Sequence, residues 1–133
     1  MALVLCTGSD PVVMKTRQLL LETGGHTVML ASNDAQVEKA CKSHQFDVAV
    51  IGQNVSPAVK QRFFRLVREH CTSTRILELL RPFNDRILEK ADATLVMLSE
   101  SPEQLVELVT ALARNEPSSF SLPSEPPTNL DLT

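Results

Sequence analysis

The sequence lacks long apolar runs and a surplus of positive charge. No stretch approaches the roughly 18 to 20 consecutive apolar residues of a membrane-spanning helix. The net charge is −3, so we expect no general attraction to nucleic acid or to an anionic membrane surface. The first residues show no basic segment followed by a small-residue cleavage site, as a secretion signal would. These absences predict a cytoplasmic protein.

Clusters of metal-binding side chains and phosphate-binding glycine motifs are also missing. Cys6, Cys41 and Cys71 are far apart and lie in apolar or helical segments, a pattern typical of reduced thiols. No cysteines and histidines cluster as zinc would require, so we expect no metal site. No G-x-G-x-x-G motif follows a strand. We therefore expect no bound cofactor.

What the sequence does contain is an alternation of short apolar segments with helical ones. The apolar segments cover residues 2–6, 26–31, 47–51, 75–80 and 93–98. Near-continuous apolar strands are typical of a parallel sheet that is covered on both faces. The alternation predicts a doubly wound α/β fold with five parallel strands, and any ligand site would lie at their carboxyl ends.

The segments between the strands carry helix signals. Asp10 precedes Pro11 as a candidate N-cap, and Val13, Thr16, Leu20 and Thr23 follow with helical period. Further helices are expected to begin after Asn33, Ser56 and Ser101. In the last of them, one face carries Leu105, Leu108, Val109 and Leu112.

The chain divides at about residue 114. Residues 1–114 are predicted to form one domain, which is a usual size for a single core. Residues 115–133 contain four prolines and four serines and show no periodicity. This composition predicts a disordered tail or the start of a linker.

Order and spacing of the segments resemble the receiver domain of two-component response regulators. The stretch LVLCTGSDPVVMKTRQLLLETGGHTVMLAS resembles a receiver's first strand, acidic turn, first helix and second strand. FDVAVIGQNVSP resembles the strand that carries the phospho-acceptor aspartate, and ADATLVMLSESPEQLVELV resembles the last strand and helix. The resemblance implies a flavodoxin-like sheet with strand order 2-1-3-4-5.

The resemblance also implies five functional groups, and none of them is present. A receiver holds Mg²⁺ with two carboxylates after its first strand, and these positions fall on Gly8 and Ser9. The phospho-acceptor position falls on Gly52, which has no side chain to phosphorylate. The hydroxyl position falls on Leu79 or its neighbour Leu80, and the lysine position falls near Met97.

Two further details bear on this corner. Asp10 is the one acid next to the Gly8-Ser9 turn, and we interpret it as a helix N-cap. The segment from Leu79 to Asp92 is about four residues shorter than the family pattern, so a fourth helix over residues 84–90 is expected to be short or distorted. In working receivers this region rearranges on phosphorylation.

The sequence therefore predicts a degenerate receiver that acts without phosphorylation. We expect a protein–protein interaction module in bacterial signal transduction, with no enzyme activity. A homodimer is expected through the fourth helix, the fifth strand and the last helix, where Val106 and Val109 are candidate interface residues. Neither nucleic acid nor a membrane is an expected partner.

Two alternatives stay open. The corner that lacks the receiver's groups, with Thr7, Ser9 and the helix start at Asp10, is a candidate site for a small anion or metabolite. Alternatively, Cys6 at the end of a strand and before a Gly-Ser turn resembles the phosphocysteine of sugar-phosphotransferase IIB domains. That reading requires a thiolate activated by the following helix.

Overall fold

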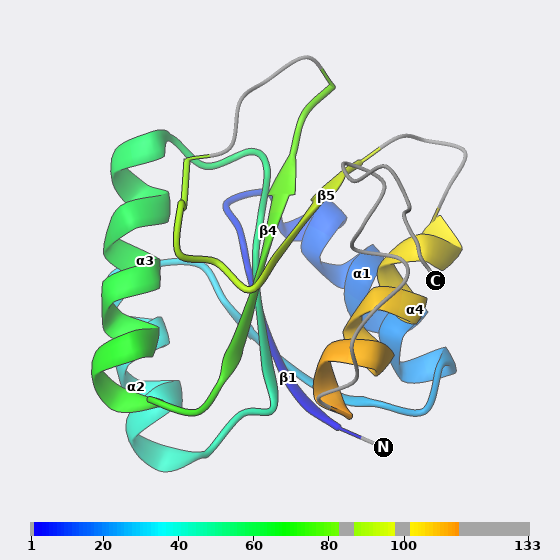
Figure 1. Ribbon diagram of the computed structural model, residues 1–133, viewed down its shortest axis with the longest axis horizontal. Coiled ribbons are helices and arrows are strands. Elements are labelled where there is room, and N and C mark those ends of the chain that lie inside the picture. The colour runs from blue at the N-terminus through cyan, green and yellow to red at the C-terminus, as the bar shows by residue number, and fades with distance from the viewer. Residues whose placement is uncertain (1, 83–86, 98–101, 115–133) are drawn as a thin grey trace, which may run out of the picture.

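The computed structural model describes residues 2–82, 87–97 and 102–114, and these residues form a single parallel sheet flanked by helices (Figure 1). The five strands hydrogen-bond in the order β2-β1-β3-β4-β5. Their bounds are Leu3–Thr7 (β1), Thr27–Ala31 (β2), Val48–Ile51 (β3), Arg75–Leu80 (β4) and Ala93–Val96 (β5). The predicted doubly wound sheet and its strand order are confirmed.

Four helices are present in the described residues, and their starts follow the predicted caps. Their bounds are Pro11–Thr23 (α1), Asp34–Ser43 (α2), Pro57–His70 (α3) and Pro102–Ala113 (α4). The side chains of Asp10, Asn33 and Ser56 each accept a hydrogen bond from a backbone N–H in the first turn of α1, α2 and α3 respectively.

The helices cover the sheet in two layers. Helices α1 and α4 lie on one face, whereas α2 and α3 lie on the other (Figure 1). Each face of the sheet has its own hydrophobic core. On the α1 and α4 face, the predicted apolar face of α4 is buried through Leu105, Leu108, Val109 and Leu112. The second core packs Phe63 and Val67 of α3 against the opposite side of the strands.

In α1 the buried face differs from the prediction. The structure buries Met14, Arg17 and Leu21, whereas Thr16 and Thr23 are exposed. Arg17, which the sequence analysis did not consider, is only 6% exposed, and its guanidinium reaches Gln53 just after β3. The opposite side of α1 is consequently turned toward solvent.

A buried histidine joins α4 to the start of β2. His26 is 7% exposed, and its Nε2 lies 2.9 Å from the Thr110 hydroxyl oxygen. That hydroxyl lies 2.8 Å from the Val106 carbonyl oxygen, which can only accept its proton, so His26 Nε2 must be the donor. Burial lowers the pKa of His26 from its ordinary value and so favours the neutral ring, whose buried Nδ1 has no partner among the described residues.

The prediction of a helix over residues 84–90 is wrong for residues 87–90, which the structure describes. Residues 83–86 lie outside the described residues, and residues 87–92 form turns and irregular backbone instead of a helix. Leu88 nevertheless fills the core on the α2 and α3 face. The backbone N–H groups of Ile87 and Leu88 donate to the Glu78 carboxylate at 2.9 and 3.0 Å, which anchors the start of this stretch to β4. We call residues 87–92 the crossover segment.

Two predictions about the chain as a whole have different outcomes. The tail predicted over residues 115–133 lies outside the described residues, so its disorder stays a prediction. No helix in the described ranges is both long and apolar enough to cross a membrane.

Candidate functional site

The corner where β1 and β3 end holds the positions that correspond to a receiver's metal and phosphate groups. Thr7 and Ile51 pair in adjacent strands, and Gly8 and Gly52 follow them directly. A Cβ atom added to Gly52 would lie 2.8 Å from the backbone oxygen of Thr7. Real Cβ atoms do not approach backbone oxygens this closely, so any side chain at position 52 requires the two strand ends to separate.

A side chain of helix α1 covers this corner next to Gly52. The Arg17 guanidinium donates from Nη2 to the Gln53 side-chain oxygen. Its Nη1 lies 3.5 Å from the point where a Gly52 Cβ would be. Desolvation lowers the pKa of Arg17 from its ordinary value. An arginine side chain therefore lies where the resemblance would place the acceptor carboxylate.

The turn after β1 carries no metal-binding group. Asp10 caps α1, because its Oδ1 accepts from the N–H of Val12 at 3.0 Å and of Val13 at 3.4 Å, as predicted. A Cβ on Gly8 would lie 3.2 Å from Met14 Cγ. Ser9 is exposed. Throughout the described ranges, no three or more His, Cys, Asp or Glu side chains gather where they could hold a metal ion.

Hydrocarbon occupies the two remaining positions. Leu79 is fully buried in the core beneath α4. Met97 is partly buried and packs against the same core, and its N–H donates to the Leu80 carbonyl at 2.9 Å. Neither side chain can bind a phosphoryl oxygen.

Cys6 does not meet the requirements of a phosphocysteine. Its side chain is fully buried in the core beneath α1 and α4. Burial raises the pKa of the thiol to about 11, although the nearby Arg17 charge opposes this shift. A thiol of this kind is protonated at neutral pH and shielded from solvent, so it cannot act as the nucleophile that the alternative needs.

A buried ion pair, which the sequence analysis missed, lies beside this corner. Lys60 of α3 is 4% exposed and Glu78 of β4 is fully buried. Lys60 Nζ donates to Glu78 Oε2 at 3.0 Å and to the Leu79 carbonyl at 2.9 Å. The signal in the sequence was a single acid inside the apolar strand RILELL, because such an acid must find a partner when it is buried.

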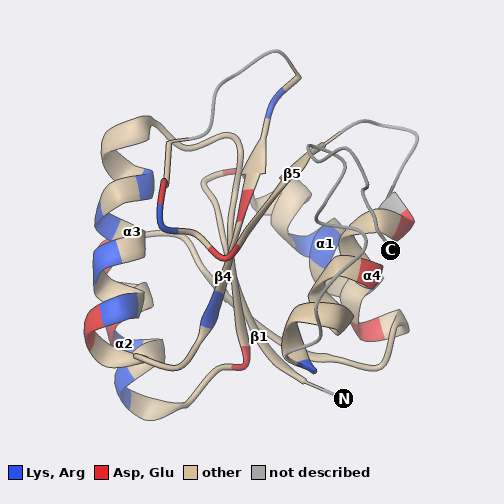
Figure 2. Ribbon diagram, in the orientation of Figure 1, with Lys and Arg blue, Asp and Glu red and all other residues tan. Residues whose placement is uncertain are grey.

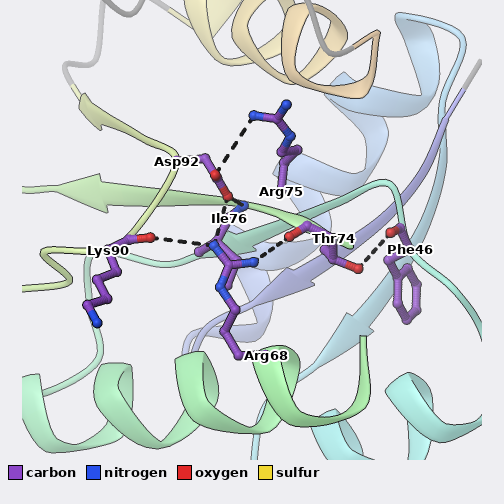
Figure 3. A network of polar contacts seen from close by, with 7 residues as sticks. All are labelled: Phe46, Arg68, Thr74, Arg75, Ile76, Lys90 and Asp92. Carbon is purple, nitrogen blue, oxygen red and sulfur yellow. Dashed lines mark hydrogen bonds and ion pairs between the residues drawn. The ribbon is translucent and has the colours of Figure 1, made fainter. Parts of the chain in front are cut away.

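A second polar network holds the far end of the crossover segment (Figure 3). Asp92 Oδ2 accepts from the Ile76 N–H at 2.6 Å and from Arg68 Nη2 at 3.0 Å. Arg68 also donates to the carbonyls of Thr74 and Lys90 at 2.7 and 3.4 Å. The crossover segment is therefore tied at its start by Glu78 and at its end by Asp92.

Basic residues recur along α3 (Figure 2), and several of their side chains form ion pairs within the molecule. Arg62 pairs with Asp34 at 2.8 Å, and Arg68 pairs with Asp92 at 3.0 Å. The positive charge of this helix is thus partly neutralised by the chain's own acids.

A cavity of about 370 Å³ opens next to the closed corner. It is lined by the loop after β3, the first turn of α3 and the end of β4, and includes Gln53, Ser56, Lys60 and Arg81. Arg81 Nε donates to the Asn54 side-chain oxygen at 3.3 Å. This cavity lies between the ends of β3 and β4, beside the corner over β1 that the sequence analysis named as a candidate anion site.

Val106 and Val109 were named as candidate interface residues, which requires them to be exposed on α4. This expectation is wrong for Val109 and partly wrong for Val106. Val109 is fully buried, because it points into the core with its neighbour Leu108. Val106 is partly buried and packs against the same core. Its Cγ1 lies 2.6 Å from where a Cβ on Gly24 would be, so α4 rests closely on the end of α1.

Comparison with known proteins supports the fold. No protein-family model matches the sequence, and no curated protein matches it. Among solved structures, a two-component response regulator from Clostridium difficile shares 18% identity at a TM-score of 0.72, covering 89% of this chain and 100% of that one. CheY4, a chemotaxis protein of Vibrio cholerae, shares 19% identity at a TM-score of 0.69, covering 84% and 98%.

A third similar structure is the response regulator TrrA in complex with the histidine kinase ThkA. It shares 19% identity at a TM-score of 0.69 and covers 84% of this chain and 98% of that chain. Together these likenesses show that the chain has the fold of a CheY-like receiver domain.

Proposed function

We propose that this chain is a receiver-fold module that acts without phosphorylation, by contact with other proteins. The observation that carries the proposal is the lack of space at Gly52. A residue that lacks a side chain, and that cannot gain one without moving Thr7, cannot serve as a phospho-acceptor. The proposed role is that of a non-enzymatic component of bacterial signal transduction in the cytoplasm.

The fixed crossover segment supports the same proposal. In working receivers the corresponding region rearranges when the acceptor is phosphorylated. Here the segment is tied to buried Glu78 at one end and to Asp92 at the other. Releasing it would leave a buried carboxylate short of partners, which is costly. A segment held in this way suits a constant binding surface better than a switch.

The proposed partner is a protein. The structure of TrrA in complex with ThkA is an example of a receiver fold bound to a histidine kinase. In this chain β5 is an edge strand, and its Val96 is 41% exposed. We propose that β5 and the exposed part of α4 around Val106 form the partner-binding face, and that residues 115–133 serve as a linker or tail.

Small-anion binding is a second candidate, favoured by the cavity beside the corner. Lys60 and Arg81 both line it, and cationic side chains in a cavity suit a phosphate-sized anion. The charge of Lys60 is, however, already matched by Glu78. We rank this candidate second for that reason.

Treatment with a phosphoryl analogue and with a phosphoryl donor tests the proposal. The ¹⁵N-labelled chain is mixed with Mg²⁺ and beryllofluoride, and separately with acetyl phosphate followed by intact mass measurement. We expect no Mg²⁺-dependent shift of the Gly8 or Gly52 amides and no added phosphoryl mass. A saturable Mg²⁺-dependent shift at either glycine would contradict the proposal.

A parallel titration with inorganic phosphate alone separates the second candidate. Saturable shifts of Ser56 and Arg81 that are lost in Arg81→Gln, with no dependence on Mg²⁺, would favour anion binding. The matched control is Arg65→Gln, which changes an exposed arginine of α3 away from the cavity.

A further inference from the structure

An apolar stripe runs along the solvent-facing side of α1. Val12 is 73% exposed and Leu19 is 54% exposed, and both belong to the large apolar residues that are usually buried. They lie seven residues apart, so they share one side of the helix. Thr16 and Thr23 continue the same line. We call Val12, Thr16, Leu19 and Thr23 the α1 stripe.

The spacing and the hydrogen bonds of the stripe suit contact with a second helix. Its members are four, three and four residues apart, which is the spacing of a coiled-coil seam. The hydroxyl of Thr16 donates to the Val12 carbonyl at 2.9 Å, and that of Thr23 donates to the Leu19 carbonyl at 2.8 Å. Burying the stripe would therefore leave neither hydroxyl without a partner.

The charges beside the stripe make it complementary to itself. Lys15 and Glu22 are both exposed and lie seven residues apart, so they flank the stripe on the same side. Lys15 Nζ donates only to the neutral Gln18, at 3.1 Å, and no ion pair engages Glu22 within the described part of the chain. In an antiparallel pair of such helices, Lys15 of each copy would lie beside Glu22 of the other.

We propose that α1 pairs with α1 of a second copy of this chain, in an antiparallel contact with two-fold symmetry along the α1 stripe. This surface is separate from β5 and α4, on which the proposed partner-binding face rests. Only one helix of 13 residues contributes from each copy. The contact is small compared with stable dimer interfaces, so we expect a dissociation constant on the order of 0.1 mM.

Sedimentation velocity of the full chain, at concentrations up to roughly ten times that constant, tests the proposal. We expect the wild-type chain to shift from monomer to dimer and Leu19→Glu to stay monomeric. Val96→Glu is the matched control, because it places the same charge on an exposed valine of β5. It should dimerise as the wild type does. Circular dichroism verifies that each variant is folded.

A charge exchange tests the antiparallel arrangement itself. Lys15→Glu and Glu22→Lys should each weaken dimerisation about tenfold, because each places like charges together twice. The double variant, which restores both pairs, should return to the wild-type constant.

Three results would overturn the proposal: a wild-type chain that stays monomeric, a double variant that does not recover, or a dimer that survives Leu19→Glu and is lost in Val96→Glu. The last result would place the dimer on β5. None of them bears on the beryllofluoride test of phosphorylation independence.

Discussion

At the scale of single residues, Gly52 connects the sequence to the proposed function. The absence of a side chain could be read from the sequence, because the flanking stretch aligns with a receiver's third strand. The crowding around it could not, since it depends on how far the Thr7 carbonyl projects from the neighbouring strand. The burial of Arg17 was equally hidden, because a charged side chain is ordinarily expected to face solvent even when it lies in period with apolar residues such as Met14 and Leu21.

The crowding predicts that Gly52→Ala is destabilising. The new Cβ would meet the Thr7 backbone oxygen at 2.8 Å, and a strand end cannot yield as a side chain does. We expect a loss of about 2 kcal/mol in the free energy of unfolding. Urea denaturation followed by circular dichroism measures it, because the chain has no tryptophan or tyrosine for fluorescence.

The control for this prediction is Gly8→Ala in the same corner. Its Cβ would lie 3.2 Å from Met14 Cγ, which belongs to a flexible side chain. This variant should lose less than about 1 kcal/mol. Equal losses in the two variants would show that the Thr7 oxygen is not the obstacle.

At the scale of elements, the crossover segment departs most from the sequence-based expectation. Apolar periodicity identified all five strands and four of the helices, because each buries a face with a recognisable period. The segment before β5 is too short to show a periodic apolar pattern. Its conformation is set by Glu78 and Asp92, which act from β4 and from its own end. Contacts between parts distant in sequence leave no local pattern to detect.

The buried pair under this segment predicts a large effect for Lys60→Met. The substitution would leave the Glu78 carboxylate buried with only the Ile87 and Leu88 amides as partners. We expect a loss of about 3 kcal/mol in the free energy of unfolding, and faster amide exchange at both amides.

Arg62→Met serves as the comparison for Lys60→Met. It removes a pair with Asp34 in which both side chains are about 45% exposed. It should cost less than about 1 kcal/mol. A loss from Lys60→Met as small as this would show that the buried pair does not hold the crossover segment.

At the scale of the whole molecule, the sequence was sufficient to predict the topology of the sheet but not which residues lie on the surface. The order of apolar strands and helices restricts the chain to a doubly wound sheet. Which side of α1 faces solvent depends on the packing of Arg17, so the exposed pair Val12 and Leu19 could not be foreseen. For Val109 the sequence was sufficient, because its spacing with Leu105, Leu108 and Leu112 places it on the buried face of α4, and its choice as an interface residue went against that spacing.

The His26 contact between β2 and α4 predicts how overall stability depends on pH. Burial, together with the positive charges of the amino terminus and Arg114, lowers the pKa of His26, and Asp47 opposes this only weakly. The unfolded chain therefore binds a proton at a higher pH than the folded chain does. Stability from this residue is fully present above pH 6.5, the ordinary histidine value, and is lost progressively as the pH falls below it.

Urea denaturation at pH 7.5 and pH 5.5 measures this dependence. His26→Phe should reduce the loss of stability between the two values, whereas His44→Gln, which changes an exposed histidine, should leave it unchanged. A wild-type chain whose stability is the same at both values, or rises on acidification, would contradict the prediction.

The burial of all three cysteines has a practical consequence. Cys6 lies in interior strand β1, while Cys41 and Cys71 lie in the α2 and α3 layer, and none is accessible in the folded chain. A thiol reagent can therefore label the protein only when it opens. Labelling at Cys41 and Cys71 ahead of Cys6 would show that one layer detaches while the sheet persists. The native chain thus carries its own reporters of partial and complete opening.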